Sequence, residues 1–324
     1  MSTSGIAGWN PSTSSIIRGA LRLLSAIAQG ETPGDGEYQE ALDALNGMVK
    51  TWQASGIHVW AEEDCTLFLQ PGQVRYLLGT GATDAATISS QWVQGWLTAT
   101  AVGGAAQIGA ASVAAIAAGD RIGIWLDAGT IFWTGVVAVV GDSVSLAAPL
   151  PSQASSGAQL VAYATPLVRP LRVPGARRYQ FAPPGGQAIE VPVVPMSRLD
   201  YANVPNKTTP GTVTQFFYDP QLGAGVMHVW PAPSDSRSAL AFTAQRPLQD
   251  FTSQADTADL PQEWISVLRY NLAREMAPEY DCPPQRFAMI AALAAEKLAL
   301  AQAWDREPQS VLFGAGAGPA GRSG

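Results

Sequence analysis

Apolar residues recur every three or four positions in two stretches near the start of the chain. The first stretch follows Ser12 and closes at Gly30, and its apolar face consists of Ile16, Ile17, Ala20, Leu21, Leu24, Ile27 and Ala28. The second lies between the loop at residues 31–36 and Gly56, with the stripe Tyr38, Ala41, Leu42, Leu45, Met48, Val49 and Trp52. This spacing predicts an amphipathic hairpin of two helices.

From Ile57 onwards the apolar period falls to two, which indicates β-structure. Leu67 and Leu69 precede a turn at residues 70–73 and a second short run at 74–77, so this segment is predicted to be a β-hairpin. Small residues and turn dipeptides then dominate as far as about Thr165, with apolar alternation at 122–126, 131–133 and 144–146. Hairpins at this spacing predict a separate small barrel or sandwich domain.

Residues 166–260 continue with strands near 216–218, 226–230 and 240–243, joined by proline-rich segments. Helical spacing returns after Pro261, with the stripe Trp264, Leu268, Leu272 and Met276, and Pro278 ends it. A fourth helix is predicted from about Pro284 to Arg306. Two helices at each end of the chain predict an α+β fold in which both ends pack into one discontinuous helical core.

Charge is sparse on this chain of 324 residues: 14% of them are charged, against roughly 25% in an ordinary domain. Such a surface suits a subunit that is covered by its neighbours better than a lone monomer. The net charge of −7 argues against binding nucleic acid through bulk charge. Neither an apolar run long enough to span a membrane nor a secretory signal is seen, so we expect assembly in the cytoplasm of the producing cell.

Recognisable cofactor and catalytic motifs are weak. Cys65 and Cys282 are too few for a disulfide framework or a zinc site and are expected to be buried free thiols. A G-x-G-x-x-G pattern at residues 316–321 lies at the chain end, without the strand and helix that would bind a dinucleotide. No nucleotide-binding P-loop, zinc-protease or hydrolase motif occurs. We therefore expect no cofactor.

Two segments of the sequence are candidates for acid–base chemistry. His58 and His228 lie on predicted strands, where half-exposed structural positions are commoner than metal or acid–base roles. Residues 62–64, Glu-Glu-Asp, would serve a glycosidase only if two carboxylates faced each other across a cleft, and a solvated turn is the simpler interpretation.

Tryptophans and arginines offer candidate binding surfaces. The tryptophans expected to be buried lie on helical stripes or in alternating strands: Trp52, Trp264, Trp304, Trp125 and Trp133. Trp92 and Trp96 are candidate interface anchors, and sugar stacking is the alternative role of such rings. The basic cluster of Arg169, Arg172, Arg177 and Arg178 favours a solvated face, with acidic neighbours or phosphate as the alternative contacts.

Two patches together resemble the head-to-tail adaptor, or tail accessory factor, of short-tailed bacteriophages. The first comprises ALDALNGMVKTW at 41–52, Gly56-Ile57, LFL at 67–69 and PGQVRYLLG at 71–79. The second comprises LPQEW at 260–264, NLA at 271–273 and MAPEY at 276–280. Between them LDY at 199–201, Lys207, Gly211, Tyr218-Asp219 and VWPAP at 229–233 follow the family's order.

The resemblance implies a structural virion protein without enzymatic activity or cofactor. Such adaptors form a dodecameric ring beneath the portal at the tail vertex, extend the DNA conduit used in genome ejection, and carry the tail nozzle or hub. DNA passes through the lumen without specific binding, and no membrane is involved. The alternative functions are a carbohydrate-binding or a cell-wall-degrading tail protein of the virion.

The resemblance also implies a domain order. Residues 1–82 form the first part of the adaptor core, 83–165 an inserted β domain, 166–306 the second part of the core, and 307–324 a C-terminal arm. Composition alone predicts that the Gly- and Ala-rich arm is disordered. In the family this arm reaches the portal, so the expected portal-binding residues are Trp304, Val311, Leu312 and Phe313.

Overall fold

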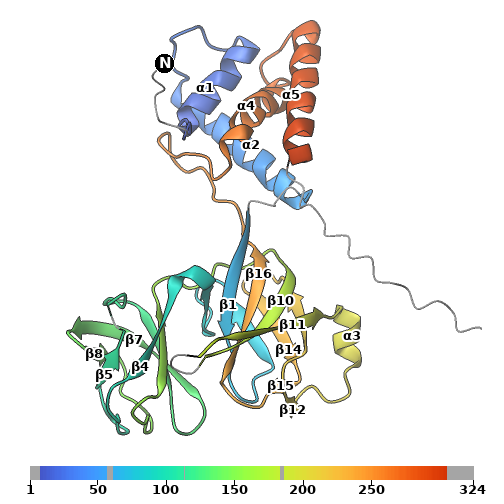
Figure 1. Ribbon diagram of the computed structural model, residues 1–324. Helices are drawn as coiled ribbons and strands as arrows, with labels where there is room; N and C mark the ends of the chain where they lie inside the picture. Colours follow the sequence, from blue (N-terminus) through green and yellow to red (C-terminus); the bar gives the residue numbers. More distant parts are fainter. Residues whose placement is uncertain (1–7, 57–60, 113, 183–185, 305–324) are drawn as a thin grey trace, which may run out of the picture. The chain divides into compact units, whose positions relative to one another are not determined.

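The computed structural model describes residues 8–56, 61–112, 114–182 and 186–304. The chain divides into two compact units: Met1–Trp60 with Leu248–Gly324, here the helical unit, and Ala61–Pro247, here the β unit. The long helices belong to the helical unit and the strands to the β unit (Figure 1). The mixed α+β class predicted from the sequence is confirmed, and so is a closed β-barrel within it.

The helical unit joins segments from the two ends of the sequence. Its helices are α1 (Thr13–Leu24), α2 (Asp35–Ala54), α4 (Ile265–Met276) and α5 (Pro284–Trp304), with a short 3-10 turn at Gln262–Trp264 before α4. Helix α4 packs against each of the other three (Figure 1). The buried side chains of α2 are those of its predicted stripe, followed by Gln53. None of the described helices is both long and apolar enough to cross a bilayer.

Helix α1 ends six residues earlier than the predicted stop at Gly30. Ser25 adopts the left-handed conformation, with φ of 63°, and the N–H of Ala26 donates to the carbonyl of Leu21 over 3.0 Å. This hydrogen bond closes the helix at Leu24. A glycine is the usual residue at such a position, so the sequence carried no signal for the early stop.

The segment that enters α4 is fastened to α1 and α2 by polar contacts. The Asn46 side chain accepts the N–H of Phe251 and donates to its carbonyl, both over 2.9 Å. The N–H of Thr13 donates to the carbonyl of Asp256 over 2.7 Å. These bonds satisfy backbone groups that would otherwise be unpaired at the edge of the helical core.

The β unit contains a curled eight-stranded sheet in the order β2-β14-β13-β11-β10-β16-β1-β3. Its strands are β1 (Glu62–Phe68), β2 (Arg75–Leu78), β3 (Ala86–Ile88), β10 (Arg172–Gln180), β11 (Ile189–Pro195), β13 (Gln215–Asp219), β14 (Gly225–Trp230) and β16 (Ser238–Gln245). Short strands β12 (Pro210–Gly211) and β15 (Ala232–Pro233) pair separately. All eight strands contribute to one core, which includes Leu67, Tyr76, Phe216, Met227 and Phe242.

The predicted hairpin between β1 and β2 is wrong. The turn exists, because the N–H of Gln73 donates to the carbonyl of Gln70 over 3.2 Å. However, β2 pairs with β14, and β1 pairs with β16 and β3. Local alternation identifies strands but not their partners, and these long-range pairings bring Tyr76 and Leu67 into the same core.

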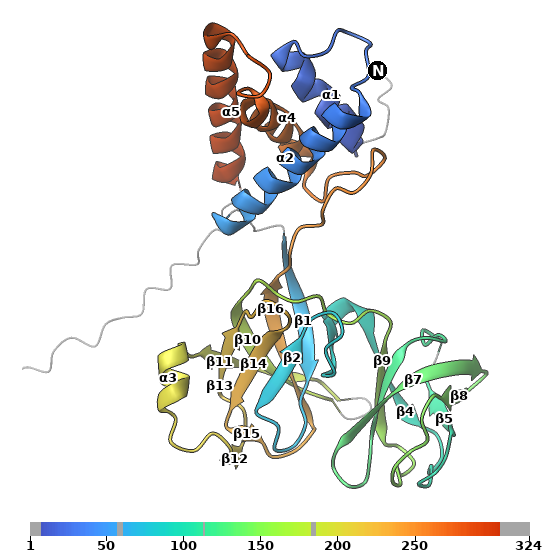
Figure 2. The same ribbon diagram turned by 180° about the vertical axis from the view of Figure 1, so that it is seen from behind.

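The closed barrel comprises β4 (Trp92–Leu97), β5 (Gln107–Ala111), β6 (Arg121–Trp125), β7 (Ile131–Val140), β8 (Ser143–Leu146) and β9 (Gln159–Tyr163). Figure 2 shows it beside the curled sheet. Closure leaves no free sheet edge, and its interior is filled by side chains such as Ile108, Ile122 and Leu160. The predicted β6–β7 hairpin is confirmed.

Strand β3, at residues 86–88, belongs to the large sheet although it falls inside the range predicted for the inserted domain. A single 3-10 turn, Ser89–Gln91, connects it to the barrel. The barrel itself therefore begins at Trp92 and ends at Tyr163.

Candidate interaction sites

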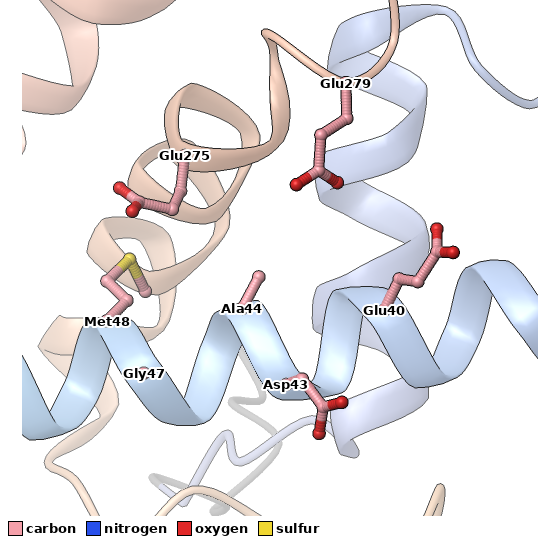
Figure 3. A pocket seen from close by; sticks show the side chains of 7 residues that line it. All are labelled: Glu40, Asp43, Ala44, Gly47, Met48, Glu275 and Glu279. Atoms are coloured by element: carbon pink, nitrogen blue, oxygen red, sulfur yellow. The ribbon is translucent and has the colours of Figure 1, made fainter.

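An acidic groove of about 660 Å³ lies between α2 and the end of α4. Figure 3 shows Glu40 and Asp43 on α2, with Glu275 and Glu279 on the opposite wall. The remaining lining residues are Ala44, Gly47 and Met48. None of the four carboxylates forms a salt bridge with another described residue.

The negative potential of this region also acts on a neighbouring phenol. Burial raises the pKa of Tyr280, and the charges of Glu37, Glu40 and Glu279 raise it further. Within the described ranges no group of three or more potential ligands is placed to hold a metal ion. The groove therefore repels anions and favours cationic groups.

An aromatic seam joins the barrel to the curled sheet. Phe68 on β1 lies 5.7 Å from Trp92, 5.2 Å from Trp133 and 6.2 Å from Tyr163, measured between ring centroids. Phe181, which follows β10, stacks on Phe68 with an interplanar angle of 1°. The seam is completed by Trp125 and Tyr179.

Two of the three indole N–H groups of the seam donate within the chain, whereas that of Trp133 is buried without a hydrogen-bond partner in the described residues. Trp92 donates to Thr66 Oγ1 over 3.2 Å, and Trp125 donates to the carbonyl of Ser236 over 2.8 Å. Trp92 thus anchors the barrel to the curled sheet within one chain.

The residues considered for glycosidase chemistry lie on strand β1, so their prediction as a turn is wrong. Glu63 forms a salt bridge of 2.9 Å with Arg246, and Asp64 lies 3.6 Å from Arg177. By the alternation of a strand, Glu62 and Asp64 project side by side from one face of β1 and Glu63 projects from the other, so none of them faces another across a cleft. The carboxylates of Glu63 and Asp64 serve as ion-pair partners on the sheet surface.

The arginines that are close in sequence are not one basic patch. Arg177 forms a salt bridge of 2.8 Å with Glu190 on one face of the sheet. Arg178 lies on the other face, where it lines a small pocket with Asp235. Arg169 donates to the carbonyl of Gln221 over 3.4 Å. Arg172, the fourth member of the predicted cluster, is exposed at the start of β10.

The histidines and cysteines show no assembled chemistry in the described part of the chain. His228 is half-buried on β14, whereas His58 lies outside the described residues. Cys65 is buried, and burial raises the pKa of its thiol to about 12, with a further contribution from Glu63 and Asp64. Cys282 is partly exposed, so the expectation that both thiols are buried is wrong for this residue.

The portal-binding residues implied by the resemblance are not described by the structure. Trp304 is the last residue of α5, and its side chain lies outside the described residues, as do Val311, Leu312 and Phe313. The G-x-G-x-x-G pattern at 316–321 lies outside them as well.

The acidic groove was not predicted from the sequence, although the spacing of its acidic residues is visible there. Glu40 and Asp43 are three positions apart, and Glu275 and Glu279 four apart, so each pair lies on one helical face or its continuation. Only the packing of α2 against α4 brings the two pairs together.

Comparisons with known proteins return nothing that identifies the chain: no family model matches it, and no curated protein sequence is similar to it.

Proposed function

We propose that this protein is a subunit of the head-to-tail adaptor ring of a short-tailed bacteriophage, attached beneath the portal and carrying the tail nozzle or hub. The observation that supports this most is the contact between the two patches of the resemblance. Trp52 of the first patch and Trp264 of the second have ring centroids 5.7 Å apart. Residues more than 200 positions apart in the sequence thus share one packing site.

Further contacts of the two patches support one discontinuous helical core. Asn271, in the second patch, is 1% exposed and donates to the carbonyls of Val267 and Ala294. A buried amide with partners on α4 and α5 fixes how these helices pack. Asn46, in the first patch, holds the segment that leads into α4.

The shorter matches in the middle of the chain also contact one another. Lys207 Nζ lies 5.2 Å from the centroid of the Tyr201 ring, and Trp230 Nε1 donates to the carbonyl of Asn206 over 3.1 Å. These residues form one group around β13 and β14. Because these residues lie together in the fold, they support treating the mid-chain matches to the adaptor family as one connected set.

The acidic groove fits a surface along which DNA slides. Its four carboxylates have no cationic partner among the described residues, so a phosphate backbone would be repelled and not retained. Repetition around a ring would multiply this charge. In this proposal the protein is not an enzyme, needs no cofactor and acts in the virion after assembly in the host cytoplasm.

The alternative function, a carbohydrate-binding or cell-wall-degrading tail protein, has less support. Trp92 packs within the aromatic seam, and two of the three carboxylates at the start of β1, those of Glu63 and Asp64, are engaged in ion pairs.

Averaged images of the particle's tail vertex test the proposal. We expect density for twelve copies of this chain beneath the portal, the number that the resemblance to the adaptor family implies, with two different faces of each subunit covered by its neighbours in the ring. A different symmetry, or a free monomer that does not associate with purified portal, would contradict the proposal.

A second test concerns the C-terminal arm. Truncation before Glu307, or Leu312→Ala combined with Phe313→Ala, is expected to abolish capture of the protein by purified portal, because burial of these two side chains contributes about 1.5–3 kcal/mol each. The control is Leu222→Ala combined with Phe287→Ala, since these apolar side chains are 99% and 40% exposed. Full binding by the truncated protein would show that the arm is dispensable.

A further inference from the structure

The short helix α3 (Arg198–Asn203) belongs to the β unit, where it packs against β13 (Figure 1). A capping box closes its start, where Ser197 Oγ accepts the N–H of Asp200 over 3.1 Å. None of its six residues is buried, and Leu199 is 69% exposed. The hydrophobic effect therefore contributes little to docking this helix.

Aromatic stacking supplies most of the contact between α3 and the sheet. The Tyr201 ring lies 4.6 Å from the His228 ring and 5.8 Å from the Phe217 ring, between centroids. Phe217 and His228 stack at 5.6 Å with an interplanar angle of 10°. These two residues are directly opposed on β13 and β14, on the face that points away from the core.

Charged groups surround this stack on three sides. Arg75 on β2 is the direct strand partner of His228. Arg198 on α3 forms an ion pair with Asp219 on β13, and its guanidinium carbon lies 5.4 Å from the Phe217 centroid. Lys207, after α3, lies over the Tyr201 ring. His228 thus has cations on both neighbouring elements and one nearby carboxylate.

That carboxylate is already engaged on both oxygens. Asp219 Oδ1 accepts from Arg198, and Oδ2 accepts from Gln221 Nε2 over 2.9 Å. Nδ1 of His228 is buried and has no hydrogen-bond partner in the described part of the chain. A proton on this nitrogen would be a buried donor without an acceptor.

We propose that His228 is a pH-sensitive switch that holds α3 on the sheet while its ring is neutral and releases the helix when the ring is protonated. Protonation places a third cation between Arg75 and Arg198 and buries an unsatisfied N–H. Release removes Tyr201 from the stack and uncovers Phe217 on the outer face of the sheet.

The direction of the pH effect follows from the environment of the imidazole. Burial lowers the pKa of His228, the charge of Arg75 lowers it further, and Asp219 opposes them only in part. Arg75 stays beside His228 in both states, whereas α3 supplies part of the burial and the charge of Arg198, which also lowers the pKa; the pKa is therefore lower with α3 docked than in the released state. Docking is strongest above the pKa of the released state and weakens as the pH falls through it, by at most about tenfold for each unit by which docking lowers the pKa.

Hydrogen exchange of the full-length chain measures the release. The amides of Tyr201 and Val204, bonded to the carbonyls of Ser197 and Tyr201, report on α3, and amides of β10 serve as the internal reference. After correction for intrinsic rates, we expect the α3 amides to lose protection between about pH 7.5 and pH 5 while β10 does not. In His228→Phe, which keeps a stacking ring but cannot titrate, α3 protection should not change with pH.

Two further measurements keep the test independent of the stability of that variant. The chain has two histidines, so an NMR titration resolves His228 by the resonance that His228→Phe removes. We expect its pKa to lie below the ordinary value, and to rise in Arg75→Gln. Equal α3 protection at both pH values, an equal loss in His228→Phe, or an unshifted His228 pKa would each overturn the proposal.

Discussion

Replacement of Trp264 by alanine is expected to lower the free energy of unfolding of the helical unit by about 3–5 kcal/mol. Trp264 is 1% exposed and lies where the incoming segment turns into α4. Its ring packs against Trp52 of α2, so truncation removes an aromatic contact and leaves a cavity at the junction of both ends of the chain. Chemical denaturation followed by helical circular dichroism measures the change.

The matched control is Trp9→Ala in the same unit. Trp9 is 57% exposed, so its truncation should change the free energy of unfolding by no more than about 0.5 kcal/mol. Equal losses in the two variants would show that Trp264 is not part of the core that α2 and α4 share.

The helices could be predicted because each has a local signal. The stripes of α1, α2 and α4 appear at the positions where the structure buries them. The error at the end of α1 arose because Ser25 takes a conformation that glycine usually supplies. Helix ends depend on single residues, whereas a stripe is an average over many.

Strand pairing could not be predicted from the same kind of signal. The alternation at β1 and β2 was correct, yet their partners β16 and β14 lie more than 140 residues further along the chain. The barrel could be predicted from the sequence because its β6–β7 hairpin joins neighbouring segments of the chain, and a domain of short hairpins closes on itself. Contacts of long sequence separation are set by the whole core and not by a turn.

For the candidate sites too, local sequence patterns could be predicted, whereas the convergence of distant residues could not. Pairs of acidic residues on α2 and around the end of α4 are visible in the sequence, but their convergence on one groove is not. The sequence makes Trp92 a candidate interface anchor, and in the structure its ring packs in the seam between the barrel and the curled sheet. His228 was considered for metal binding or catalysis, and its neighbours instead make it part of an aromatic stack with α3.

Phe68→Ala is expected to destabilise the β unit by about 3–5 kcal/mol and to loosen the barrel from the curled sheet. Phe68 is 1% exposed, and its ring contacts aromatic residues of the barrel on one side and Phe181 on the other. The strand that carries it belongs to the curled sheet, while Trp92 and Trp133 belong to the barrel. Truncation therefore removes the side chain that both packing layers share, and repacking cannot fill the gap without shifting one layer.

Tryptophan fluorescence measures this change, because Trp92, Trp125 and Trp133 all line the seam. Phe287→Ala is the matched control, since this ring is 40% exposed on α5 and belongs to the other unit. Combining Phe68→Ala with Trp264→Ala should give additive losses, because the two residues lie in separate compact units and share no contact partner. A loss for Phe68→Ala no larger than that of the control would mean that the barrel and the sheet are held together elsewhere, and a strongly non-additive pair would mean that the two sites are energetically coupled.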